Sequence, residues 1–308
     1  MNKVKHIAAI ICSLFWMQMM GQELEPRSIN NLPVGSNFLV GGYGFARGNI
    51  LLDPALPIDG VNSNIHTLVA GYVRSIKFLG MSSKIDVILP FATGDYEGAL
   101  DEELNIARRT GFGDIRLRFS FNFVGSGAMD AKQFQSYSPD VVSGISIQLI
   151  APTGYYDSEV LINPGSNRWV VKPQWGIAKS YEKWNIEGYV GLWIFGENDN
   201  YLQGNSLKQE PLLTIKGHAI RTLKNNSWIS LSAGYGVGGR TKVNEVRRET
   251  QISTMRLAFL YALPISKKST LKFTALTGIR FERGSDYNGI ALSYQYRWLQ
   301  KKERLKLN

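Results

Sequence analysis

The chain has 308 residues and a formal net charge of +10, with 31 glycines, one cysteine and 11% aromatic residues. The single cysteine excludes a disulfide scaffold, and beyond the first two dozen residues no apolar run reaches the roughly 18 residues that a membrane-spanning helix needs. Charged residues make up only 19%, below the usual share of about a quarter, and this glycine- and aromatic-rich composition favours an all-β protein.

Residues 1–21 have the pattern of a signal peptide. Two lysines in the first five residues precede an apolar stretch from Ile7 to Met20, which is too short and too near the terminus for a spanning helix. We expect export and cleavage after Gly21. Cleavage there removes the only cysteine, Cys12, and leaves the mature chain without thiol chemistry. An uncleaved anchor is the alternative.

The rest of the chain divides into three parts. We expect residues 22–36 to form a periplasmic N-terminal segment or partial plug, residues 37–298 a β-barrel, and residues 299–308 a basic C-terminal tail. The signal peptide carries +2 and the tail +3, which leaves +5 for the body. A basic exported body favours anionic lipid headgroups or anionic solutes as partners, and no nucleic acid.

Alternation of apolar and polar residues is the clearest pattern in the sequence. In Asp114–Phe123, five apolar side chains alternate with five polar ones, which places them on opposite faces of a strand. Similar runs predict twelve strands, several of them longer than the typical globular strand of about 5–6 residues. The strands are expected at about 37–46, 62–78, 83–95, 111–123, 140–153, 167–180, 183–196, 209–223, 227–239, 250–264, 269–282 and 287–298.

The connections between these runs alternate in length. Short turns are expected at Leu79–Ser82, Tyr181–Glu182, Lys224–Asn226 and Ile265–Lys268. Longer polar loops are expected at Arg47–Val61, Tyr96–Thr110, Gly154–Ser166, Glu197–Lys208 and Arg240–Glu249, whereas Arg283–Asp286 is short. This rhythm is typical of a transmembrane antiparallel barrel of the Gram-negative outer-membrane type, with short turns and both termini in the periplasm.

One expected periplasmic link, Gly125–Pro139, is long and has the composition of one or two helical turns. It either caps the barrel rim or forms a partial plug.

Tryptophans fall near the expected strand ends. Trp184, Trp228 and Trp298 lie at predicted periplasmic ends and Trp169 at an outer end, as in the aromatic girdles of membrane barrels. The final strand ends in Trp298, and a terminal aromatic is a signal for the barrel-insertion machinery, although ten residues follow it here. We therefore expect outer-membrane lipids and that machinery as partners, and a monomer.

Four segments resemble one known family: ELEPRSINNLPVGSNFLVGGYG, RTGFGDIRLRFSFNF, IAPTGYYD and NPGSNRWVVKPQWGIAKSY. The turn Gly111–Asp114 and the motif Pro152–Tyr156 are the most recognisable parts. The family is the group of outer-membrane barrels labelled "MetA-pathway of phenol degradation", and the resemblance covers nearly the whole mature chain. It implies a barrel fold and a transporter function, and it supplies no catalytic residues.

Strand parity assigns an excess of basic residues to the barrel lumen. The inward basic residues are expected to be Arg74, Lys84, Arg116, Arg118, Arg168, Lys172, Lys216, Arg256, Lys272, Arg280 and Arg297. The inward acidic residues are Asp86, Asp114 and Glu187, and His66, His218, Tyr72, Tyr189 and Trp193 are also expected inside. Rings of basic side chains select anions. Alternatively, salt bridges fill the lumen, because twelve strands lie between filled barrels of about eight strands and open porins of about 16.

Three classes of function remain. The first is a passive channel for small solutes, either anionic or aromatic and hydrophobic. The second is a non-conducting structural, adhesion or assembly barrel, and the third is an outer-membrane lipid-modifying enzyme. Catalysis is least favoured because the sequence has no G-x-S-x-G motif, and two mature histidines without H-E-x-x-H or paired cysteines give no zinc site. We expect no cofactor and no metal.

Overall fold

The computed structural model describes residues 24–49, 62–100, 103–160, 162–281 and 285–300. The expected signal peptide therefore lies outside the described residues. Within those ranges, no helix is long and apolar enough to cross a membrane.

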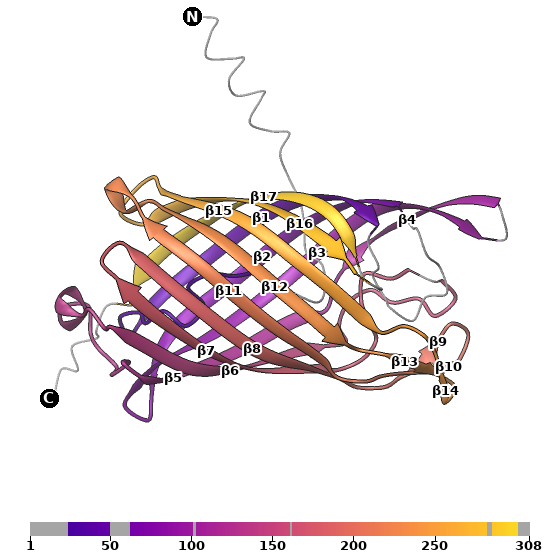
Figure 1. The fold of residues 1–308 in the computed structure, drawn as a ribbon, viewed down its shortest axis with the longest axis horizontal. Helices are drawn as coiled ribbons and strands as arrows, with labels where there is room; N and C mark the ends of the chain where they lie inside the picture. The colour runs from indigo at the N-terminus through magenta and orange to yellow at the C-terminus, as the bar shows by residue number, and fades with distance from the viewer. Residues whose placement is uncertain (1–23, 50–61, 101–102, 161, 282–284, 301–308) are drawn as a thin grey trace, which may run out of the picture.

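Twelve antiparallel strands close into a barrel (Figure 1). β1 pairs with β17 over its whole length, from Ser36 opposite Leu299 to Asn49 opposite Asp286, and this pairing closes the cylinder. The barrel strands are β1 Ser36–Asn49, β2 Asn62–Phe78, β3 Met81–Leu100, β5 Ile115–Val124, β6 Val141–Ala151, β7 Val170–Tyr181, β8 Trp184–Phe195, β11 Leu212–Thr222, β12 Trp228–Gly238, β15 Ile252–Pro264, β16 Ser269–Arg280 and β17 Asp286–Leu299. The predicted all-β, twelve-stranded barrel is confirmed.

The two ends of the barrel differ. At the end that we call the turn end, short links join β2 to β3, β7 to β8, β11 to β12 and β15 to β16. The first link is a two-residue turn, Leu79–Gly80, with φ values of 47° and 81°. Positive φ at both central residues gives the twist that a tight hairpin needs. The opposite end, the loop end, carries longer connections.

The link from β5 to β6 at the turn end contains one short 3₁₀ turn, η2 (Gln133–Ser136). Asp130 precedes this turn, and its side chain accepts hydrogen bonds from the backbone N–H groups of Lys132 and Gln133, both at 3.0 Å. Val34 donates a backbone hydrogen bond to Met129 in the same link at 2.8 Å. The link therefore lies at the rim of the barrel, against the residues that precede β1.

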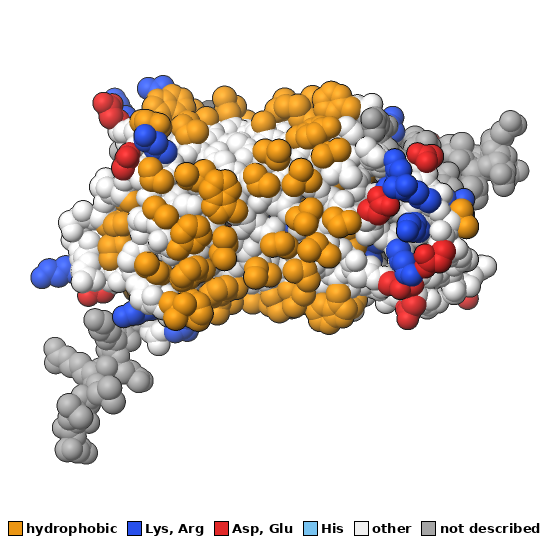
Figure 2. All heavy atoms as spheres, turned by 60° about the horizontal axis from the view of Figure 1, so that its bottom comes forward, with side chains coloured by type: hydrophobic (Ala, Val, Ile, Leu, Met, Phe, Trp, Pro, Cys, Tyr) orange, Lys and Arg blue, Asp and Glu red, His pale blue; other side chains and the backbone are white. Residues whose placement is uncertain are grey.

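The barrel is apolar outside and polar inside. In β5, Leu117 is 40% exposed on the outer surface, whereas the neighbouring Arg116 is 8% exposed on the inner face. Figure 2 shows the consequence on one face of the barrel, where apolar side chains cover the middle and charged side chains lie toward the ends. An outward-facing apolar band of this kind is typical of barrels that span the hydrocarbon core of a membrane.

A β-hairpin replaces one expected loop. β3 extends to Leu100, and β4 (Glu103–Phe112) pairs with its second half, so Tyr96–Thr110 is not an irregular loop. The hairpin projects beyond the barrel (Figure 1). Gly113 separates β4 from β5, where its N–H donates to the Pro90 carbonyl at 2.9 Å. A Cβ at Gly113 would lie 2.9 Å from the Pro90 ring, so a larger residue would crowd this break.

Two further loops form a separate small sheet. It consists of β9 (Asn198–Tyr201), β10 (Asn205–Gln209), β13 (Thr241–Val243) and β14 (Val246–Arg247), in the order β14-β13-β10-β9. The expected loops Glu197–Lys208 and Arg240–Glu249 are thus ordered against each other.

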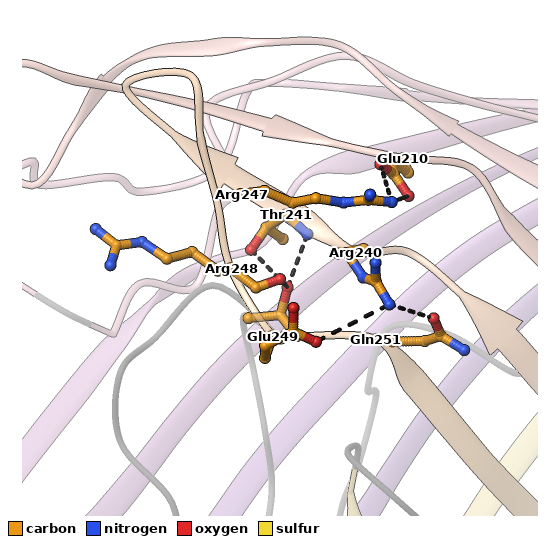
Figure 3. A network of polar contacts seen from close by, with 8 residues as sticks. Glu210, Arg240, Thr241, Arg247, Arg248, Glu249 and Gln251 are labelled. Carbon is orange, nitrogen blue, oxygen red and sulfur yellow. Dashed lines mark hydrogen bonds and ion pairs between the residues drawn. The ribbon is translucent and has the colours of Figure 1, made fainter.

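Polar contacts hold the base of this small sheet (Figure 3). Arg247 forms an ion pair with Glu210 at 3.0 Å, and Arg240 donates to Gln251 at 2.9 Å. In the same network the Thr241 N–H donates to the Thr250 hydroxyl at 2.7 Å. These contacts tie β13 and β14 to the ends of β11 and β15, so the loop end has a built structure of its own.

Candidate functional site

The inner face of the barrel carries most of the charged side chains expected there. Burial and strand register place the following residues on it: Lys84, Asp86, Arg116, Arg118, Lys172, Glu187, Lys216, His218, Arg256, Lys272 and Arg297. Arg168 is buried near the loop end, where it donates to Gln209 at 2.7 Å. The expected inward aromatics Tyr189 and Trp193 are each only 2% exposed.

The parity expected for β2 is wrong. Arg74 lies directly opposite Ile85, which is 43% exposed on the outer surface, and it donates to the exposed Gln300. Tyr72 stands on the same outer face and packs against Trp298, with ring centroids 6.2 Å apart. Arg74 is therefore not a lumen residue.

The cause of this error is that both faces of β2 mix apolar and polar side chains. Ser63, Ile65 and Thr67 alternate onto the inner face and are almost fully buried, so His66 between them points outward. At the turn end, Tyr72 and Arg74 reach the level at which aromatic and basic side chains favour the membrane interface. Polarity alone therefore does not identify the inner face of this strand.

Inside the barrel, three cations of the described barrel strands lie over the faces of buried aromatic rings. The pairs are Lys172 over Trp193 at 4.4 Å, Lys216 over Tyr189 at 5.4 Å and Arg256 over Tyr287 at 5.2 Å. Aromatic faces stabilise positive charge where water is scarce.

The described residues before β1, 24–35, lie against the inner wall near the turn end; we call them the N-terminal segment. Asn122 of β5 donates to the Ile29 carbonyl at 2.6 Å and to the Asn31 side chain at 2.7 Å. Lys84 of β3 donates to the Ser28 carbonyl. Contacts to several strands thus fix the segment within the lumen.

Arg27 extends this contact to the opposite wall. Its N–H donates to the Glu187 carboxylate at 2.7 Å, and its guanidinium donates to Thr222 at 3.2 Å. The guanidinium also lies 4.5 Å from the ring centroid of Trp228, which is 7% exposed. Trp228 consequently faces the lumen, and its expected place in the outer girdle is wrong.

The other girdle tryptophans, Trp169, Trp184 and Trp298, are exposed on the outer surface. Sequence parity could have separated Trp228 from them, because it is in phase with the buried Ser230 and Ser232.

Arg118 forms ion pairs with two acidic residues in this region. It pairs with Asp86 and, at 2.8 Å, with Glu25 of the N-terminal segment. One guanidinium therefore contacts two carboxylates.

A cavity of about 950 Å³ lies between the N-terminal segment and the wall formed mainly by β1–β3 and β15–β17. Residues of the turn-end links, including Phe134, Asn226 and Lys267, line its outer end. Phe38, Val40, Val73 and Leu260 give it an apolar side, and Lys272 and Arg297 add positive charge.

Toward the loop end, the lumen contains an apolar cluster. Ile162, Tyr201 and Leu207 from loop-end segments pack with inward side chains of the barrel strands. Those partners are Ala46, Ile65, Tyr96 and Tyr287. The loop end of the lumen is thus packed, while the turn end holds the cavity.

Asp114 forms hydrogen bonds with the loop that connects β6 and β7. Its carboxylate accepts hydrogen bonds from the N–H of Gly154 at 2.9 Å and from the N–H and hydroxyl of Ser166 at 2.9 and 2.6 Å. The GFGD turn and the loop Gly154–Ser166, both parts of the resemblance, therefore contact each other. Arg280, at the loop end, lies 3.7 Å from Asp286.

Among the described residues, His218 shares one hydrogen bond, between its Nδ1 and the Ser232 hydroxyl at 2.8 Å. Its other nitrogen, Nε2, is buried without a hydrogen-bond partner among the described residues. A serine–histidine nucleophile needs a third group to orient the imidazole. No such group contacts Nε2 in the described part of the chain, and no cluster of three or more potential metal ligands occurs there.

Comparison with known proteins gives one family match. A family model described as "Putative MetA-pathway of phenol degradation" matches residues 43–297. No curated protein matches the sequence.

Several solved structures are similar. The COG4313 outer membrane channel from Pseudomonas putida F1 has a TM-score of 0.75 and 17% identity, over 90% of this chain and 100% of that chain. The Pseudomonas putida toluene transporter TodX has a TM-score of 0.47 and 9% identity, over 92% and 99% of the two chains. The beta domain of the Bordetella autotransporter BrkA has a TM-score of 0.45 and 12% identity, over 85% and 99%. The first of these likenesses supports the barrel fold.

Proposed function

We propose, since the chain belongs to the family described as putative MetA-pathway of phenol degradation, that it is a passive channel for small solutes in the outer membrane of a Gram-negative bacterium. The observation that carries this proposal is the cavity of about 950 Å³ inside the barrel. Its volume lies in the range of sites that hold small organic molecules, roughly 300–1,000 Å³.

The chemistry of the wall supports passage of a solute. Lys272 and Arg297 offer charge on one part of the cavity, and Phe38, Val40 and Val73 offer apolar surface on another. Polar groups give a solute its orientation, while apolar groups give it contact area. Anionic and aromatic solutes both fit this combination.

A non-conducting barrel is the second candidate. The N-terminal segment occupies the turn end, and the cluster around Ile162, Tyr201 and Leu207 packs the loop end. A barrel with its turn end narrowed by this segment and its loop end packed by the cluster would serve a structural, adhesion or assembly role.

Conductance distinguishes these two functions. Purified protein in planar bilayers should give discrete current steps in potassium chloride. Solute flux into liposomes should then rise with protein content and stay unaffected by an energy source. Complete absence of both currents and flux would favour the non-conducting barrel.

The proposed location depends on the expected signal peptide and the outer apolar band. Export through that peptide, insertion by the barrel-insertion machinery and a monomeric state complete the proposal. The protein should fractionate with the outer membrane, and unboiled protein should migrate differently from boiled protein on a denaturing gel. Recovery from the periplasm as a water-soluble protein would contradict this location.

We propose transport in preference to lipid modification. The support is the contact between His218 and Ser232, in which no third group orients the imidazole among the described residues. Release of fatty acid from phospholipid by pure protein, abolished in Ser232→Ala, would favour the enzyme.

A further inference from the structure

The cavity near the turn end has an unequal charge. Among the residues that line it, the basic side chains are Arg27, Lys84, Arg118, Lys267, Lys272 and Arg297, and the acidic ones are Glu25 and Asp86. Both carboxylates are paired with Arg118. The acidic charge is therefore gathered at one point of the wall, and positive charge prevails over the rest of the cavity.

Lys272 is the cation best placed to meet a solute. It stands on β16 opposite Ala262 on one side and Ser293 on the other, neither of which can neutralise an ammonium group. No described carboxylate forms an ion pair with it; Glu25 and Arg27 act on it only through longer-range electrostatics, with opposite signs.

Apolar side chains lie close to the same cations. Phe38 stands opposite Arg297 across the β1–β17 ladder and opposite Val73 across the β1–β2 ladder. Val40 and Leu260 continue the apolar lining of the cavity. Positive charge and hydrocarbon surface thus face one enclosed space.

From this juxtaposition we propose that the cavity binds amphipathic organic anions, in which a carboxylate is carried on an aromatic or aliphatic body. Lys272 binds the carboxylate, Arg297 adds positive charge to the same cavity nearer the turn end, and the wall of Phe38, Val40 and Val73 holds the body. The proposal rests on the proposed channel function, and it assigns that channel a class of solute. A charged hydrogen bond in a confined space is stronger than one in water, which gives the anion its preference over a neutral analogue.

Calorimetry with two matched probes tests the proposal. The full chain, kept in amphipol, is titrated with 4-phenylbutyrate and with 4-phenylbutan-1-ol, which share the aromatic body and differ in charge. The acid should bind more tightly than the alcohol. Lys272→Gln should lower the affinity for 4-phenylbutyrate by about tenfold, because it removes one charged contact. The affinity for 4-phenylbutan-1-ol should stay unchanged. Lys183→Gln, in the exposed turn between β7 and β8, is the matched control and should change neither.

Two measurements on the unaltered protein keep the test independent of the variants. A higher sodium chloride concentration should weaken the binding of 4-phenylbutyrate and leave that of 4-phenylbutan-1-ol unchanged, since salt screens the charge contact. Propionate, which lacks the aromatic body, should bind more weakly than 4-phenylbutyrate. Equal affinity for acid and alcohol, or unchanged acid binding in folded Lys272→Gln, would overturn the anion assignment. Equal binding of propionate would reduce the site to one for small anions and overturn the amphipathic assignment. Binding without flux into liposomes would overturn only the channel function.

Discussion

At the scale of single residues, Arg118 and Asp86 form an ion pair on the inner wall. Their side chains are 13% and 3% exposed, so the pair is largely withdrawn from water. Arg118→Leu leaves Asp86 charged, buried and without this partner, and should lower the free energy of unfolding by about 3–5 kcal/mol. The double variant Arg118→Leu/Asp86→Leu should be closer to the unaltered protein, because the buried carboxylate is gone and Glu25, which also loses Arg118, is half exposed.

Urea-induced unfolding in lipid vesicles, followed by tryptophan fluorescence, gives both values. If the double variant is less stable than Arg118→Leu, the loss of stability comes mainly from losing the ion pair and not from leaving the Asp86 carboxylate unpaired.

Leu117, the neighbour of Arg118, tests the outer face. Its side chain is 40% exposed in a strand whose inner side chains are buried, and it belongs to the outer apolar band. Leu117→Arg should cost about 2–4 kcal/mol, the cost of a cation near the middle of the bilayer. The same unfolding measurement applies, with Leu117→Val as the control of similar polarity. If Leu117→Arg leaves the free energy of unfolding unchanged, this part of β5 does not face hydrocarbon.

The alternation that identifies the two faces of β5 is ambiguous in β2. In β5 every outer residue is apolar and nearly every inner one is polar, so period two has a single solution. In β2 the inner face includes Ile65, which packs in the loop-end cluster, while Arg74 extends to the outer interface. A one-residue shift then reverses every assignment, and only pairing with β1 and β3 resolves it.

At the scale of elements, strand length and turn position were predictable, whereas long-range pairing was not. The range expected for β2 is the observed one, Asn62–Phe78, because turn residues bound a long alternating run. The extension of β3 into a hairpin with β4, and the sheet made by β9, β10, β13 and β14, depend on partners that lie outside the local sequence. Their polar composition is compatible with a loop or with an exposed strand.

Asp114 is expected to hold the connection between β6 and β7. Its carboxylate accepts three hydrogen bonds from Gly154 and Ser166, and no single neutral side chain can replace them all. Asp114→Ala should therefore speed proteolytic cleavage within Gly154–Ser166 while the barrel keeps its heat-modifiable mobility on a gel.

Asp130→Ala is the matched control, because Asp130 also accepts backbone hydrogen bonds but lies at the turn end. Unchanged cleavage in Asp114→Ala, or equal acceleration in both variants, would show that Asp114 has no specific hold on this loop.

At the scale of the whole molecule, this barrel reverses the arrangement of a soluble protein: apolar side chains lie outside and polar side chains are buried inside. The outer band takes the apolar face, so the charged residues of alternating strands gather in one enclosed lumen. The sequence predicts this accumulation of cations from parity alone. It does not show which part of the lumen is filled, because the N-terminal segment and the loop-end cluster reach the inner wall through contacts distant in sequence.

The N-terminal segment is expected to restrict the turn end of the lumen and leave its selectivity to the wall. Deletion of residues 24–34 removes Glu25, which pairs with Arg118, and the backbone that Lys84 and Asn122 contact. Single-channel conductance should rise as the section widens. The reversal potential in a potassium chloride gradient should then indicate chloride preference, because Lys172, Lys216 and Arg256 remain on the inner face.

Fixed positive charge in a narrow passage concentrates anions, most strongly at low salt, where screening is weak. Lys172→Glu/Lys216→Glu in the deleted chain should therefore shift the reversal potential toward potassium. The change in selectivity should shrink as salt rises. Cation preference before the substitutions, or no shift after them, would contradict control by the wall. An unchanged conductance on deletion would place the narrowest section at the loop-end cluster, where Ile162, Tyr201 and Leu207 pack against the barrel.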